Sequence, residues 1–175
     1  MITSKFFLSL LLLFTLMSRV CLADDTLEQS LINAIEQNKT SASRDTLYGS
    51  AIRAYKNQNY INKKPNNRAD YTDYYLLNKP ATFMGHDLKV IEEEYMSAYI
   101  GCCVSPGLGL SLKIRGSLTG LKAFAGENGC SVEENINLYQ ELTDIGIKVH
   151  PMSGHYVHLS CRERDLATAN ADNTH

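Results

Sequence analysis

The histidines near the C-terminal end are the first residues whose types suggest chemistry. His150, His155 and His158 lie within nine residues of one another, close to Cys161. Imidazole and thiolate groups are the ligands that zinc prefers in proteins. On a strand, however, His155 and His158 point to opposite faces because their spacing is odd. We therefore predict no metal site and no cofactor, and interpret these histidines as parts of a surface hairpin.

Carboxylates form a second group with chemical potential. Glu92, Glu93 and Glu94 follow one another, and on a strand the first and third share a face. A glycosidase needs such a pair of carboxyl groups across a cleft. No pattern in the sequence indicates a cleft, and charge runs usually lie in water. We therefore expect a solvated charged face.

Other catalytic patterns are incomplete. Arg162 and Arg164 could bind an anion, but we expect them to pair with Glu163 and Asp165 or to stay solvated. The chain has no G-x-S-x-G elbow for a serine nucleophile. Its PGLGLSL stretch lacks the Lys-Ser/Thr ending of a phosphate loop. The sequence therefore favours a binding protein over an enzyme.

The first 23 residues have the layout of a secretory signal. Lys5 precedes an apolar run over 6–17, and Cys21-Leu22-Ala23 offers a cleavage site. The run is shorter than the about 20 residues that span a bilayer. We expect a mature chain that starts near Asp24, has no membrane span, and is periplasmic or extracellular.

The charge balance bears on the partner. The chain has 17 Lys and Arg against 19 Asp and Glu, and only Lys5 and Arg19 fall in the leader. The mature chain is therefore mildly acidic. Phosphate binding needs a concentrated basic face. We expect a protein partner and no nucleic acid.

Four cysteines follow the leader: Cys102, Cys103, Cys130 and Cys161. An even count in an exported chain predicts two disulfides. A bridge between the adjacent pair would close a strained ring. We therefore expect Cys130 to take one member of the pair and Cys161 to take the other, with the assignment left open.

The elements that must position these residues fall into blocks. Apolar spacing predicts helices over 25–38 and 44–57, then a polar loop over 57–68. We expect this helical segment to contribute less to stability than the stapled remainder. Strands are predicted over 70–77, 81–84, 88–96, 99–104 and 108–114, helices over 117–129 and 132–145, and a closing hairpin over 147–161. Residues 88–96 also fit a helix face, but Gly85 and Asp87 mark a turn that favours a strand.

The sum is an α+β fold: an N-terminal helical pair, then a mainly antiparallel sheet with one or two packed helices, stapled by disulfides. The predicted organisation is a signal peptide over 1–23, a single domain over 24–164 with a sheet-containing core over 69–164, and a flexible tail over 165–175.

These features predict a small exported binding protein, such as an inhibitor or immunity factor that blocks a secreted hydrolase through a polar loop. A secreted enzyme and an envelope-associated structural protein are the alternatives. The predicted contact loop comprises His150, Ser153, Gly154, His155 and Tyr156. Gly154 allows a tight turn, and Tyr is enriched at binding hot spots.

Overall fold

The computed structural model describes residues 26–36, 45–95 and 104–166. Residues 26–36 form the first helix. The other elements are α2 (Asp45–Asn57), β1 (Asn67–Ala69), β2 (Thr72–Leu76), β3 (Thr82–Phe83), β4 (His86–Glu94), β5 (Gly107–Lys113), α3 (Thr119–Glu127), β6 (Ser131–Glu134), α4 (Leu138–Asp144) and β7 (Tyr156–Arg162).

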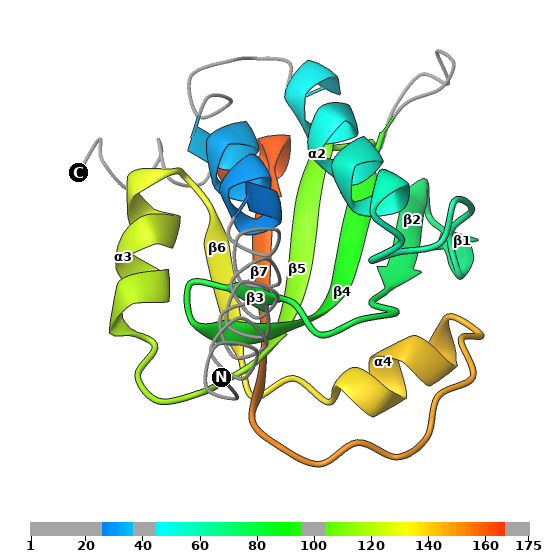
Figure 1. The fold of residues 1–175 in the computed structure, drawn as a ribbon. Coiled ribbons are helices and arrows are strands. Elements are labelled where there is room, and N and C mark those ends of the chain that lie inside the picture. Colours follow the sequence, from blue (N-terminus) through cyan, green and yellow to red (C-terminus); the bar gives the residue numbers. More distant parts are fainter. Residues whose placement is uncertain (1–25, 37–44, 96–103, 167–175) are drawn as a thin grey trace, which may run out of the picture.

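One antiparallel sheet organises the molecule (Figure 1). Its strand order is β1-β2-β4-β5-β7-β6, and β3 pairs with β4. The stretch predicted as a strand from residue 88 is a strand, although β4 begins earlier, at His86, and includes residues expected in the turn; the alternating stretch of β5 is also a strand, as predicted. The predicted α+β class with a mainly antiparallel sheet is confirmed.

The main core lies between one sheet face and three helices: residues 26–36, α2 and α3. Leu31 and Ile52 of the helices join Ile91, Leu110 and Leu159 of the sheet in one buried cluster. Helical and strand residues therefore share a single core. The expectation that the N-terminal helices are a minor, separate contributor to stability does not fit this packing.

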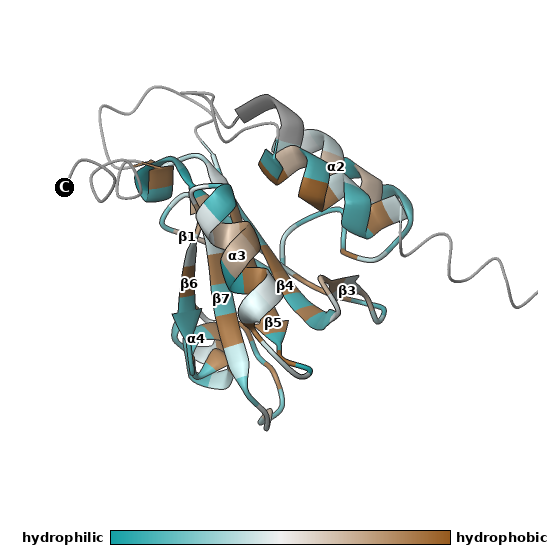
Figure 2. Cartoon of the chain, turned by 90° about the vertical axis from the view of Figure 1, so that its left-hand side faces the viewer, coloured by the Kyte–Doolittle hydropathy of each residue, from teal (hydrophilic) through white to brown (hydrophobic). Residues whose placement is uncertain are grey.

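The opposite face is covered by α4 and the loop that follows it, so α2 and α4 lie on opposite sides of the strands (Figure 2). Val90 of the sheet packs here with Leu138, Leu142, Ile147 and Tyr156. The side chain of Asn137 caps α4 by accepting a hydrogen bond from the Gln140 amide at 3.2 Å.

Two predicted elements are wrong in part. Residues 132–145 do not form one helix, because Val132 pairs with Leu159 in the sheet and Asn135 then turns the chain with a φ of 60°. Residues 147–155 do not form a hairpin strand. The partners of β7 are β5 and β6 instead, since its apolar residues Val157 and Leu159 belong to the main core.

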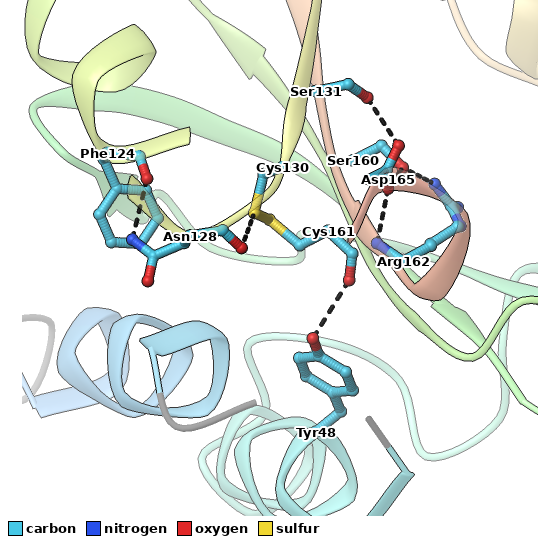
Figure 3. Close-up of a disulfide and its surroundings, with 9 residues drawn as sticks. All are labelled: Tyr48, Phe124, Asn128, Cys130, Ser131, Ser160, Cys161, Arg162 and Asp165. Carbon is cyan, nitrogen blue, oxygen red and sulfur yellow. Dashed lines mark hydrogen bonds between the residues drawn. A yellow bond between two sulfur atoms is a disulfide. The ribbon is translucent and has the colours of Figure 1, made fainter. Parts of the chain in front are cut away.

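The disulfide pairing also differs from expectation (Figure 3). Cys130 is bonded to Cys161, with their Cα atoms 4.4 Å apart. The register that pairs Ser131 with Ser160 brings these cysteines opposite each other at the end of the β6–β7 ladder. Neither is therefore available to the doublet Cys102-Cys103, which lies outside the described residues.

The end of the chain is ordered further than predicted. Asp165, the expected first residue of a flexible tail, accepts hydrogen bonds from Ser131, Ser160 and the backbone of Arg162. Within the described ranges, no helix is long and apolar enough to cross a membrane.

Candidate functional site

A buried ionic network occupies the α4 side of the sheet. Arg162 lies between Glu92 and Glu94, with Nη2 at 2.7 Å from Glu92 Oε2 and Nε at 2.9 Å from Glu94 Oε2. The side chains of these three residues are 4%, 11% and 5% exposed, respectively. The prediction of a solvated glutamate face is wrong. Burial of both carboxylates is tolerated because a cation lies between them.

Two glycines in β5 make room for the network. Glu92 pairs with Gly109 and Glu94 with Gly107 across the β4–β5 ladder. A Cβ at Gly109 would lie 2.7 Å from Glu92 Oε2 and 2.9 Å from Arg162 Nη2. The charged groups therefore meet above a strand that has no side chain at that position.

Further contacts fix the positions of the charged groups. Ser160 accepts a hydrogen bond from Arg162 Nη1 at 2.9 Å and donates to Asp165 at 2.8 Å. Glu94 accepts from the Ser105 amide at 2.8 Å and from Arg164 Nη1 at 3.0 Å. The arginines thus pair mainly with the strand glutamates rather than with Glu163, and Arg162 meets Asp165 through its backbone amide.

His158 completes the set, with Nε2 at 3.2 Å from Glu92 Oε2. Burial acts to raise the pKa of Glu92, but the interactions with His158 and Arg162 outweigh it and lower the pKa to about 2. Glu92 is therefore a carboxylate that stays ionised and is held in a fixed orientation.

Glu92 and His158 border a pocket of about 380 Å³ between the sheet and α4. Its polar lining combines these two residues with three more carboxylates and a tyrosine. The lining residues are Tyr74, Glu92, Glu133, Leu138, Glu141, Leu142, Asp144, Ile145 and His158. We call this site the acidic pocket.

Desolvation shifts the pKa of two further groups of the acidic pocket. Glu141 is an exposed residue, and the partial desolvation of its carboxyl group raises its pKa; the charge of His158 opposes this shift, and those of Glu133 and Glu92 add to it. Burial also raises the pKa of Tyr74. The pocket thus holds one carboxyl group that ionises very readily and another that ionises reluctantly.

The lining suits a cationic guest better than an anion. Four carboxylates face one imidazole, and the positive charge of Arg162 is already shared by Glu92 and Glu94. Among the described residues, no group of three or more His, Cys, Asp and Glu side chains has the geometry of a metal site. The predicted histidine hairpin supplies only His158 to the pocket.

The predicted contact loop lies elsewhere. His150, Ser153, Gly154 and His155 are exposed in the loop between α4 and β7 and do not line the acidic pocket. Tyr156 belongs to the predicted contact loop, but it is only 6% exposed and packs under α4. The loop can thus present four of the five residues to a partner.

Sequence reasoning missed the partnership of Glu92, Glu94 and Arg162. The available signal was alternation: the two glutamates share one face of β4, and Gly107 and Gly109 share one face of the next strand. The pairing register of β5 and β7 places Arg162 opposite Gly107, and this register cannot be predicted from the local sequence.

In comparisons with known proteins, no family model, curated protein or solved structure matches this chain.

Proposed function

We propose that the protein is an exported binding protein, of the inhibitor or immunity type, whose acidic pocket receives a basic side chain of a partner protein. The observation that carries the proposal is the pocket lining, in which Glu92, Glu133, Glu141 and Asp144 surround a space of about 380 Å³. The leader pattern of the sequence supports export, and so does the Cys130–Cys161 disulfide, since such bonds are typical of oxidising compartments.

Preorganisation supports a binding role. Glu92 is oriented by Arg162 and His158 before any partner arrives, so binding costs little side-chain entropy at that position. The exposed carboxylates of Glu133 and Asp144 add negative potential at the mouth, which accelerates association with a positive patch. A lysine or arginine side chain satisfies both features.

The exposed loop offers a separate contact surface. It leaves α4 at Ile145, which lines the acidic pocket, and its other end lies against β5, where the His155 carbonyl accepts a hydrogen bond from the Ile114 amide at 2.9 Å. His150, Ser153, Gly154 and His155 can therefore contact a partner outside the acidic pocket, whereas buried Tyr156 supports the loop from below by donating to the Ser153 carbonyl at 3.3 Å.

Affinity capture tests the proposal. The oxidised, processed protein is used as bait for culture or envelope extract, and intact mass checks that processing occurs near Asp24. The Glu133→Gln/Glu141→Gln variant should lose most capture, and capture by the wild type should fall as salt rises. Glu127→Gln is the matched control, because Glu127 is exposed on α3 at the other sheet face. Equal capture by all three proteins would contradict the proposal.

A second candidate function, acid–base hydrolysis, is favoured by the divergent pKa values of Glu92 and Glu141. In that case Glu141 donates the proton and ionised Glu92 stabilises positive charge. A panel of glycoside and ester substrates separates the two functions: hydrolysis that Glu141→Gln abolishes supports the enzyme, and no turnover on any substrate supports the binding role.

A further inference from the structure

A second pocket of about 460 Å³ lies on the other side of α4, and its lining includes residues of both hydrophobic cores, such as Leu88 of the main core and Val90 of the core under α4. Leu138 and Leu142 of α4 line both pockets. The second pocket differs in chemistry, because most of its lining is aliphatic. Its apolar residues are Leu76, Leu77, Pro80, Ala81, Leu88, Val90, Leu138, Leu142 and Met152. We call it the apolar pocket.

A β-bulge supplies polar groups to the rim of this pocket. The β4–β5 register shifts between Leu88 and Val90, so Lys89 is an extra residue with no pairing partner in β5. A bulge of this kind re-aims side chains, and here Lys89 and Val90 both line the pocket. The cation is thereby placed beside the aliphatic floor.

The rim carries an excess of positive charge. Asp87 is shared by two cations, with Arg115 Nη2 at 2.5 Å and Lys89 Nζ at 3.4 Å. Lys79 donates to the carbonyl of Gln58 at 2.9 Å and lies over the Tyr60 ring, 5.2 Å from its centroid, and neither partner carries a negative charge. Three cations therefore stand against one carboxylate in the lining.

We propose that the apolar pocket binds a single-chain amphipathic carboxylate of the fatty-acid type. The alkyl chain lies on the aliphatic floor, and the carboxylate meets Arg115 and Lys79 at the rim. This site is independent of the acidic pocket and goes beyond the function proposed above. It assigns opposite ligand charges to the two sides of α4.

The lining favours an alkyl chain over a peptide. A peptide segment carries an amide at every residue, and each amide placed on an aliphatic floor without a hydrogen-bond partner loses free energy. The charged groups of the pocket cluster at its rim, where Arg115 is 66% and Lys89 37% exposed in their side chains. One charged end and a long apolar body match that distribution.

Methionine methyl signals provide a direct test. Met152 lines the apolar pocket, whereas Met84 packs against the main core and does not line the pocket. The protein is expressed with its full sequence, labelled with ¹³C-methyl methionine and titrated with dodecanoate below its micelle concentration. The Met152 signal should shift and saturate, and the Met84 signal should stay in place.

Three further probes identify what the pocket recognises. Butanoate has the same head without the tail, and dodecyltrimethylammonium has the same tail with the opposite charge; both should bind at least about tenfold more weakly than dodecanoate. A short acetylated Leu-Leu-Glu peptide represents the alternative ligand class. The proposal is overturned if Met152 ignores dodecanoate, prefers the ammonium probe, or responds to the peptide alone.

Variants test the rim. Arg115→Gln/Lys79→Gln should weaken dodecanoate binding about fivefold or more, since charge-assisted contacts are the stronger hydrogen bonds. Lys122→Gln is the matched control, because Lys122 is an exposed α3 residue that pairs with Glu134. Undiminished binding by the double variant would also overturn the assignment of the carboxylate to this rim.

Discussion

Removal of Arg162 should show how much the buried ionic network contributes to the unfolding free energy. The substitution Arg162→Met keeps a long apolar side chain but withdraws the cation from Glu92 and Glu94. Both carboxylates lie within 3 Å of the guanidinium in the wild type and are almost fully buried. Stranding buried charges in this way typically costs about 3–5 kcal/mol of unfolding free energy.

The structure narrows this range. A pKa of about 2 for Glu92 in the folded protein, against 4.5 for an unperturbed glutamate, corresponds to about 3 kcal/mol of stability at neutral pH. Part of it survives, because His158 still contacts Glu92 and Arg164 still contacts Glu94. We therefore expect a loss of about 3 kcal/mol at pH 7, at the lower end of the range.

The pH dependence has a definite sign. The pKa of Glu92 is lower in the folded protein, so its contribution is present above about pH 4.5 and is lost as pH falls toward about 2. In the variant, protonation of Glu92 removes a buried charge that has lost its main partner, so it stabilises the folded protein. The deficit of Arg162→Met should therefore shrink steadily between pH 5 and pH 3.

Urea unfolding followed by far-UV circular dichroism at pH 7 and pH 3 measures both effects. Arg164→Met is the control, because its side chain is 54% exposed and it should cost no more than about 1 kcal/mol. A deficit below about 1 kcal/mol for Arg162→Met at pH 7, or one that is unchanged at pH 3, would refute the reasoning.

Three further predictions test the fold. Replacing Cys130 and Cys161 by Ala should lower the unfolding free energy by about 4 kcal/mol in denaturant titrations, since the disulfide spans 31 residues; an unchanged midpoint would contradict this. A chain that begins at Arg68 should fail to melt cooperatively in calorimetry, because it lacks two of the three helices that cover the main core; a sharp transition would show that the N-terminal helices are a separate, minor contributor to stability. Tyr156→Ala should cost about 3 kcal/mol while exposed His155→Ala costs under about 0.5, and equal midpoints for the pair would show that Tyr156 is not a core residue.

Periodicity predicted most of the fold because local patterns there agree with tertiary packing. Leu108, Leu110 and Leu112 alternate, and they do face one core. The helix predicted over 132–145 was wrong because the spacing of Val132 and Ile136 also fits a helical period, whereas Val132 pairs with Leu159 in the sheet. Short segments whose partner lies far along the chain are where tertiary pairing overrides local pattern.

The candidate site was hidden for a related reason. Glu92 and Arg162 are 70 residues apart, and nothing local marks either as buried. Charge runs are usually solvated, so the side chains of Glu92–Glu94 were expected to face solvent. Only the sheet register, with glycines of β5 between β4 and β7, brings the charges together and encloses them.

The network itself argues for a role beyond stability. Replacing a buried ion triad by apolar residues of similar size is often neutral or stabilising, so ionic burial is a weak way to hold a sheet together. What the triad does achieve is position: Arg162 and His158 fix one oxygen of Glu92 at 2.7 and 3.2 Å, at the wall of the acidic pocket. A carboxylate with that little freedom loses little entropy on meeting a cation. The glycine at position 109, which admits the triad, is on this reasoning part of the binding apparatus.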